Sequence, residues 1–188
     1  MPMNLWNTKI HCKDSNQYIN SIFYCMDYRN KIVKEIVHQF KYKKTTSIKY
    51  TLNQIISASL QNYKQYFNKK DFLIIPVPLH KYKQRARGFN QSEIISDIIS
   101  NILDIETKNN ILIRFKNNPP QANQEDSTKR KQNAENIFKI NENLKHLIQN
   151  KNIILVDDVF TTGSTLNECA KILKENSAKD IYAICLAR

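Results

Sequence analysis

Glycine is scarce in this chain, which has two glycines among its 188 residues, Gly88 and Gly163. Glycine reaches backbone conformations that other residues avoid, and it has no Cβ to keep a neighbouring group at a distance. A chain with so few glycines has little backbone freedom to spare. We therefore expect each of the two to mark a loop whose backbone closely approaches a ligand, and both loops have the composition of phosphate-binding segments.

Long apolar runs are missing as well. No run approaches the roughly 18 residues that a membrane-spanning helix needs, and the first six residues lack a basic region followed by an apolar stretch, as a secretory signal would have. The composition is that of a globular protein, with 41% apolar and 24% charged residues. The sequence predicts one cytoplasmic domain with a sizeable core, either an enzyme or a binding protein, without membrane insertion.

Cysteines are few, and none of the four forms a C-x-x-C pair. Cys169 and Cys185 lie in apolar stretches, so we expect them to be small buried hydrophobic residues. Cys12 and Cys25 together with His11 could in principle hold zinc, but their spacing matches no common structural site. The sequence therefore does not predict a zinc cofactor.

Acidic residues are outnumbered. The chain has 29 lysines and arginines against 17 acids, a formal net charge of +12. Such an excess favours an anionic partner, either nucleic acid or a phosphorylated ligand. An alternative is a compositional bias, because lysine, asparagine and isoleucine are abundant throughout and the lysines are dispersed. The charge alone does not decide between the two.

The periodicity of apolar residues divides the chain into two parts. Residues 21–28 are predicted to form a strand, and helical stripes follow at 32–40 and 48–67, so residues 1–70 are expected to be a mostly helical N-terminal lobe. Residues 71–188 alternate between strands and helices, which predicts an α/β core with a mostly parallel sheet flanked by helices. The strands of this core are expected at 72–77, 111–115, 153–156 and 181–187, its helices at 94–103 and 165–175, and an exposed loop at 116–130.

The strongest motif follows the strand at 153–156. Asp157 and Asp158 come first, then the turn 161–165 with the sequence TTGST, which opens a helix. Ligands of open α/β sheets bind at the carboxyl ends of the strands. Unpaired N–H groups and the helix dipole make such a helix start suitable for a phosphate, and the hydroxyls of Thr161, Thr162, Ser164 and Thr165 add donors beside Gly163.

The two acids repel a phosphate, so they suit the sugar next to it. A carboxylate accepts strong hydrogen bonds from two vicinal ribose hydroxyls, and the whole segment then describes a cradle for ribose 5-phosphate. Residues 165–168 also have the form of a capping box, which would explain Thr165 and Glu168 without any ligand. Capping explains neither the double acid nor the Thr-Thr-Gly sequence, so we favour the ligand.

A basic segment follows the strand at 72–77. It contains Lys81, Lys83, Arg85, Arg87 and Gly88, and a basic loop beyond a strand is suited to bind pyrophosphate, because arginine matches phosphate oxygens with a planar fork of donors. The alternative is a solvated loop. Asn90 to Glu93 has the form of a capping box, so Asn90 is also expected to start a helix.

These segments resemble known motifs. Residues 153–165 are similar to the phosphoribosyl diphosphate (PRPP) motif of type I phosphoribosyltransferases, in which Asp-Asp and two variable residues precede Thr-Thr-Gly-x-Thr. Residues 76–91, with Val-Pro-Leu and Arg-Gly-Phe-Asn-Gln, resemble the ComF family of competence-associated phosphoribosyltransferase-like proteins. Gln121, Arg130, Asn133 and Phe138 extend this likeness. Many members begin with zinc-binding cysteine pairs that this chain lacks, which places any zinc-dependent role in doubt.

The resemblance implies a type I phosphoribosyltransferase-like fold that binds PRPP with Mg²⁺, held mainly by the ligand. By that likeness Asp157 and Asp158 hold the ribose hydroxyls and residues 161–165 hold the 5′-phosphate. Lys81, Arg85 and Arg87 would bind the leaving pyrophosphate beside Gly88, and Arg130 would close over the site. The catalytic residues implied are Asp157, Asp158, Arg87 and Arg130.

Three functions fit these motifs. The first is an enzyme that transfers the phosphoribosyl group of PRPP to an acceptor that the sequence does not identify, since no general base stands out. The second is a competence-associated protein that handles single-stranded DNA. The third is a regulator that senses PRPP or a nucleoside monophosphate without turnover.

Overall fold

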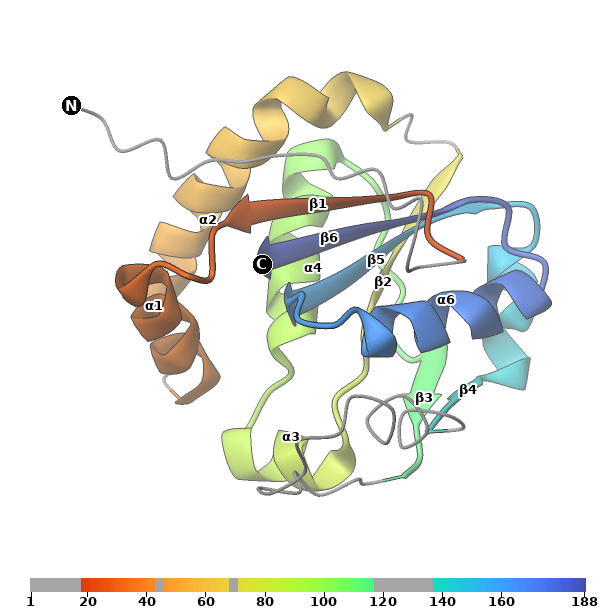
Figure 1. Ribbon diagram of the computed structural model, residues 1–188. Helices are drawn as coiled ribbons and strands as arrows, with labels where there is room; N and C mark the ends of the chain where they lie inside the picture. The colour runs from red at the N-terminus through yellow and green to blue at the C-terminus, as the bar shows by residue number, and fades with distance from the viewer. Residues whose placement is uncertain (1–17, 43–45, 68–70, 117–136) are drawn as a thin grey trace.

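The computed structural model describes residues 18–42, 46–67, 71–116 and 137–188. Its centre is a four-stranded parallel sheet in the order β1 (Ser21–Met26), β6 (Ile181–Ala187), β5 (Asn152–Val159) and β2 (Phe72–Pro76). Helices lie on both faces of this sheet (Figure 1). The predicted α/β class with a mostly parallel sheet is therefore confirmed.

The strands of this sheet are apolar because both of their faces are covered. Residues 153–156 of β5 have no exposed surface, and all five residues of β2 are buried. Parallel sheets of this kind are built from continuous apolar runs rather than from alternating ones. The register pairs Ile154 with Ile74 on one side and with Tyr182 on the other, so that β5 lies inside the sheet.

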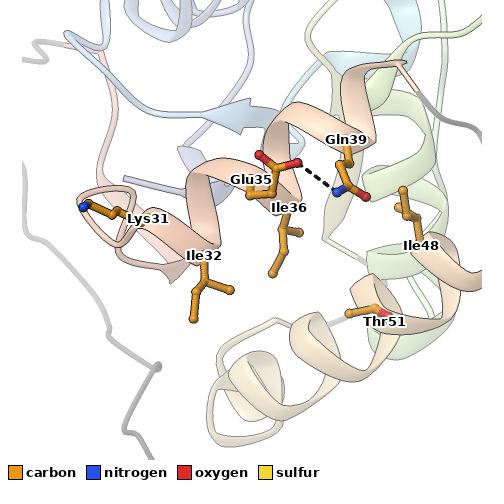
Figure 2. Close-up of a pocket in the computed structure, with 7 residues that line it drawn as sticks. All are labelled: Lys31, Ile32, Glu35, Ile36, Gln39, Ile48 and Thr51. Carbon is orange, nitrogen blue, oxygen red and sulfur yellow. Dashed lines mark hydrogen bonds between the residues drawn. The ribbon is translucent and has the colours of Figure 1, made fainter.

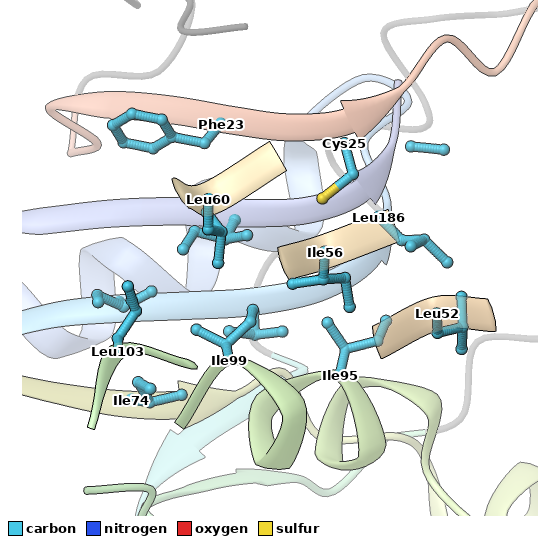
Figure 3. Close-up of a cluster of buried hydrophobic side chains, with 14 of the residues drawn as sticks. Phe23, Cys25, Leu52, Ile56, Leu60, Ile74, Ile95, Ile99, Leu103 and Leu186 are labelled. Carbon is cyan, nitrogen blue, oxygen red and sulfur yellow. The ribbon is translucent and has the colours of Figure 1, made fainter. Parts of the chain in front are cut away.

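One face of the sheet is covered by α2 (Thr46–Leu60) and α4 (Gln91–Leu103). Leu52, Ile56 and Leu60 recur every four residues of α2 and are buried, and α4 presents a matching stripe. This spacing places each set on one side of its helix. Figure 3 shows the two stripes packing between the helices and the strands, together with Phe23 of β1 and Ile74 of β2.

The expected N-terminal lobe does not stand apart from the core. It contains α1 (Lys31–Tyr42), α2 and the short 3₁₀ helix η1 (Gln61–Tyr66), as the helical stripes predicted. However, β1 pairs in parallel with β6, and a single buried cluster joins α1 and α2 to α4. The pairing and the cluster cross the predicted division at residue 70, and strand pairing between distant segments leaves no local trace in the sequence.

The other face carries α6 (Ser164–Glu175), the 3₁₀ helix η2 (Glu142–Ile148) and a small separate sheet. That sheet pairs β3 (Leu112–Arg114) with β4 (Phe138–Ile140) in antiparallel fashion. The strand expected at 111–115 therefore exists but lies outside the central sheet. The loop expected at 116–130 falls almost entirely outside the described residues.

The buried cysteines fill the core as expected. Cys169 and Cys185 have no exposed surface and are not bonded in a disulfide. Cys25 is 2% exposed and packs in the cluster shared with α2, whereas Cys12 and His11 lie outside the described residues. Within the part of the chain that the structure describes, no helix combines the length and the apolar character that crossing a bilayer requires.

The four parallel strands all end at the same edge of the central sheet. From this edge the chain continues into α1 after β1, into α3 (Lys81–Arg87) after β2, and into the turn before α6 after β5. The parallel topology therefore gathers three segments that are far apart in the sequence, and these segments surround the candidate site.

Candidate active site

A cavity of about 370 Å³ opens at the carboxyl edge of the sheet. Its walls come from the end of α1, the segment after β2, the start of α4, the end of β3 and the end of β5. The polar residues that line it are Lys41, Lys83, Arg87, Asn90, Gln91, Ser92, Arg114, Asp157, Asp158, Thr161 and Thr165.

The two acids lie near the end of strand β5 and are held by different partners. Oδ1 of Asp157 accepts hydrogen bonds from the Ser92 hydroxyl at 3.1 Å and from the Asp158 backbone N–H at 2.8 Å. Oδ2 of Asp158 lies 3.2 Å from Nζ of Lys41, which stands near the end of α1. Helices α4 and α1 therefore orient the acidic pair from two directions.

The surroundings of Asp157 change the pKa of its carboxyl group. Burial is the main reason that the pKa of Asp157 is raised to about 7, and the neighbouring Asp158 raises it further. The hydrogen bonds from Asp158 and Ser92 and the charge of Lys41 oppose this rise. A ligand that donates hydrogen bonds or brings positive charge favours the ionised form, so the pair is suited to hydroxyl donors and to cations.

The hydroxyl-rich turn lies directly beside the acids. Thr161 and Thr165 line the cavity, while the three residues between them form the turn itself. Oγ atoms of Thr162 and Ser164 are hydrogen-bonded at 2.9 Å, and Gly163 is buried with φ of +75°. Gly163 is the N-cap residue of α6 and has no side chain to cap this helix, although the Thr162 hydroxyl accepts the N–H of Ser164 at 3.4 Å.

The alternative interpretation of this turn as a capping box is wrong. Helix α6 begins at Ser164 with Gly163 as its N-cap, two residues earlier than a cap at Thr165 would allow. Oε1 of Glu168 accepts a hydrogen bond from the backbone N–H of Ile137 at 2.8 Å, so this carboxylate joins α6 to the segment before β4. Thr165 faces the cavity without being needed as a cap.

The basic segment is a helix rather than the expected loop. His80 starts α3, since its Nδ1 accepts the N–H of Tyr82 at 3.3 Å. One helical turn separates Lys83 from Arg87, so both face the cavity. Lys81 and Arg85 are exposed and do not line the cavity, so the structure does not bring these two expected pyrophosphate ligands together with the acidic pair.

Gly88 ends α3, and its conformation explains why it is glycine. Its φ is +77°, in the left-handed region that glycine enters without strain. A Cβ built at this position meets no protein atom within 4 Å. The helix C-cap therefore explains this glycine without a ligand, and the expected approach of its backbone to a ligand stays a prediction.

Asn90 starts α4, as the capping pattern predicted, and also anchors this helix to β2. Its Oδ1 accepts the N–H of Ser92 at 3.2 Å, and its Nδ2 donates to the carbonyl of Val77 at 3.1 Å. The next residue, Gln91, accepts a hydrogen bond from Arg87 at 3.1 Å and donates to the carbonyl of Lys41 at 3.3 Å. Helices α1, α3 and α4 are thereby joined around the cavity.

Several residues of the site carry no sequence signal of their own. Lys41, Ser92 and Arg114 come from elements whose positions in space depend on the fold. Lys83 was visible in the basic segment, and a helical interpretation of residues 81–87 would have paired it with Arg87. Arg130 lies outside the described residues, as do Gln121 and Asn133, so the predicted closure over the site stays a prediction.

Positive charge exceeds negative charge in the cavity wall. The described lining residues include four cations, Lys41, Lys83, Arg87 and Arg114, against the two acids Asp157 and Asp158. Burial lowers the pKa of Lys83, and the nearby charges of Arg114, Arg87 and Lys41 lower it further. Such a cluster is suited to a ligand with several negative charges.

A second cavity has a different character. It has a volume of about 450 Å³ and lies between α1 and α2, faced by Ile32, Ile36 and Ile48. Figure 2 shows these apolar side chains together with Glu35, which accepts a hydrogen bond from Gln39 at 2.8 Å. None of the predicted site residues lines this cavity, so the chemistry of the chain is concentrated at the acidic pair.

Comparison with known proteins gives consistent similarities. Residues 90–188 match the phosphoribosyl transferase domain. The chain is 35% identical to Competence protein F of Haemophilus influenzae over 154 residues, which cover 81% of this chain and 66% of that protein. It is 28% identical to Competence protein ComFC of Bacillus subtilis over 160 residues, which cover 85% and 61%. The chain thus spans about two thirds of the length of these relatives.

Among solved structures, the chain is similar to the glutamine phosphoribosylpyrophosphate (PRPP) amidotransferase from B. subtilis. The sequence identity is 13% and the TM-score is 0.48. The similarity covers 79% of this chain and 30% of that enzyme.

Proposed function

Because the chain belongs to the phosphoribosyl transferase domain family, and within it to the ComF group, we propose that it binds PRPP and transfers the phosphoribosyl group to an acceptor. One observation carries the proposal. A single cavity is lined by the acid pair at the end of β5, by Thr161 and Thr165 of the following turn, and by Lys83 and Arg87 from α3.

In this proposal the sugar phosphate lies along the end of β5. The 5′-phosphate is received by the amides at the start of α6 and by the threonine hydroxyls, because the N-cap residue Gly163 has no side chain to occupy these amides. The carboxylates of Asp157 and Asp158 accept hydrogen bonds from the two ribose hydroxyls. Ser92 and Lys41 hold these carboxylates in place before the ligand arrives.

The pyrophosphate group extends toward α3. Lys83 and Arg87 face the cavity from one side of this helix, whereas Lys81 and Arg85 do not line it. Gln91 accepts a hydrogen bond from one arm of Arg87, which leaves the other donors of the guanidinium for phosphate oxygens. The helix thereby places two cations where the leaving charge develops.

The donor set of the cavity fits Mg²⁺. This ion prefers oxygen ligands and is commonly held by one or two carboxylates together with substrate phosphates. Asp157 and Asp158 supply such carboxylates, and no group of three or more metal-ligating side chains gathers among the described residues. When bound with PRPP, the ion would neutralise part of the pyrophosphate charge.

The reaction breaks the bond between the anomeric carbon and pyrophosphate, which leaves with the bonding electron pair, and forms a bond from the acceptor to that carbon. Catalysis then rests on alignment of the two reactants and on stabilisation of the departing charge. No histidine or cysteine occurs among the described lining residues. The proposal therefore assigns positioning and charge to the protein and the nucleophile to the acceptor.

Calorimetric titration with PRPP in millimolar Mg²⁺ tests this function. The wild-type protein is expected to bind, while Asp157→Asn and Asp158→Asn lose binding because the ribose hydroxyls lose their charged acceptors. Asp180→Asn, the same change directly before β6 at the opposite edge of the sheet, should leave binding unchanged. A wild-type protein that gives no heat with PRPP would refute the proposal.

Two alternative functions can be tested with the same purified protein. The matched relatives are named competence proteins, and the net charge of +12 favours a single-stranded DNA partner. That function predicts an affinity for single-stranded DNA that falls steeply with salt, and salt-independent affinity would count against it. A regulator that senses PRPP would bind it but release no pyrophosphate with any amine or base as acceptor.

A further inference from the structure

Arg114 enters the cavity from outside the central sheet. It is the last residue of β3, and its Cζ lies 5.4 Å from the ring centroid of Phe138 on the paired strand β4. Its side chain is half-buried and lines the cavity together with Lys83 and Thr165. The small antiparallel sheet thus contributes one guanidinium to the site.

The surroundings of this guanidinium leave one of its N–H donors without a hydrogen-bond acceptor. Nε of Arg114 is buried and makes no hydrogen bond within the described part of the chain. Burial lowers the pKa of Arg114, and Arg114 in turn lowers the pKa of Lys83. A desolvated cation whose Nε has no acceptor, placed near a second cation, is unfavourable.

An arginine that only supported the fold would be expected to meet a carboxylate or backbone carbonyls. The guanidinium of Arg114 lies over the ring of Phe138, and such a contact uses none of its N–H donors. Its charge is attracted by Asp157 and Glu168, whereas its Nε has no hydrogen-bond acceptor within the described part of the chain. This donor is therefore left for a group that enters the cavity.

We propose that Arg114 binds a phosphoryl oxygen of the ligand, from the side of the cavity formed by the β3–β4 sheet. This inference rests on the proposed function and adds a residue to it. Arg114 shares the cavity wall with Thr165 at the start of α6 and with Lys83 of α3. A phosphoryl oxygen in its reach belongs either to the 5′-phosphate or to the pyrophosphate group.

Arg114→Met is the informative variant, because methionine keeps an apolar side chain against Phe138 and removes the charge and the donors. Arg114→Lys restores the charge alone. Arg29→Met is the control, since Arg29 is an exposed arginine whose side chain pairs with Asp27. Each protein is titrated calorimetrically with PRPP, with ribose 5-phosphate and with pyrophosphate, all with Mg²⁺, and melted without ligand.

The inference predicts weaker ligand binding without a loss of stability. Arg114→Met should weaken PRPP binding by about tenfold to a hundredfold, the worth of a hydrogen bond to a charged group, and Arg114→Lys should recover part of it. The melting temperature of unliganded Arg114→Met should be unchanged or higher. Weakening confined to ribose 5-phosphate would place Arg114 at the 5′-phosphate, and weakening confined to pyrophosphate would place it at the leaving group.

Two results would overturn the inference. One is unchanged affinity for all three ligands in Arg114→Met. The other is a melting temperature that falls clearly below that of Arg29→Met, which would indicate a structural role. If the wild-type protein binds no PRPP, the proposed function fails on its own, and the titration with pyrophosphate still decides whether Arg114 binds phosphoryl oxygens.

Discussion

Nζ of Lys41 and Oδ2 of Asp158 lie 3.2 Å apart and join the end of α1 to the end of β5. Both side chains are largely buried, with 26% and 18% of their surfaces exposed. An N-terminal helix thereby contributes a charge to the acidic pair. This contact is a direct structural reason to treat residues before β2 as part of the site.

Replacing Lys41 with methionine should lower the free energy of unfolding at pH 7, because Asp158 would keep a largely buried charge without its partner. We expect a coupling of about 1–3 kcal/mol between Lys41→Met and Asp158→Asn, between the values typical of exposed and of buried pairs. Urea unfolding of the two single variants and the double variant measures it. The exposed Lys34→Met is the control on the same helix, and additive effects would contradict the expectation.

The stability of the protein should depend on pH through Asp157. Its ordinary pKa of 3.8 is raised to about 7 in the folded protein, so between these values the folded state holds a proton that the unfolded chain has released. Raising the pH through this window therefore removes stability. Asp157→Asn should become more stable relative to the wild-type protein as the pH rises from about 4 to about 7, by on the order of a few kcal/mol.

Urea unfolding at a series of pH values measures that difference. Asparagine retains the oxygen that accepts hydrogen bonds from Ser92 and from the Asp158 N–H, so the variant is a conservative comparison. A difference between the two proteins that stays constant from pH 4 to pH 7 would show that Asp157 is ionised throughout.

The helical form of residues 81–87 predicts unequal effects from two neighbouring arginines. Arg87→Ala should weaken the binding of PRPP and of pyrophosphate by about tenfold or more, because Arg87 faces the cavity. Arg85→Ala should change it little, because Arg85 is exposed on another side of the helix. Calorimetric titration of both variants compares them directly, and equal losses would favour a mobile basic loop over the helix.

Gly88→Ala should cost about 1–2 kcal/mol of stability without affecting ligand binding. The cost arises because a Cβ disfavours the left-handed conformation, while the added atom meets nothing within 4 Å. Asparagine tolerates this conformation better, so Gly88→Asn should cost less. Urea unfolding and PRPP titration test both variants. Weaker PRPP binding by Gly88→Ala would restore the interpretation that this backbone approaches the ligand.

The strand, the acid pair and the hydroxyl turn were predictable because they are contiguous. Asp157 and Thr165 are joined by one short loop. A strand followed by a helix places both residues at the same edge of a sheet, independently of the rest of the fold. The class of the fold was predictable for a related reason, since the alternation of strands and helices is a property of local periodicity.

The orientation of the basic residues was not predictable from composition. Whether residues 81–87 are a loop or a helix depends on His80 as the N-cap and on Gly88 as the C-cap, and both residues were open to other interpretations. Once the segment is helical, its periodicity brings Lys83 and Arg87 into the cavity and leaves Lys81 and Arg85 outside. A shift of one residue in such a pattern changes which charges meet a ligand.

The amino-acid sequence by itself determined the parallel α/β core and the acidic pair followed by a hydroxyl-rich turn, because both depend on neighbours in the chain. Only the tertiary structure decided that β1 joins the sheet, that Lys41 and Ser92 hold the acids, and that Arg114 reaches the same cavity. The physical reason is that these contacts join residues far apart in the chain, whose meeting is set by packing and strand pairing rather than by local conformational preference.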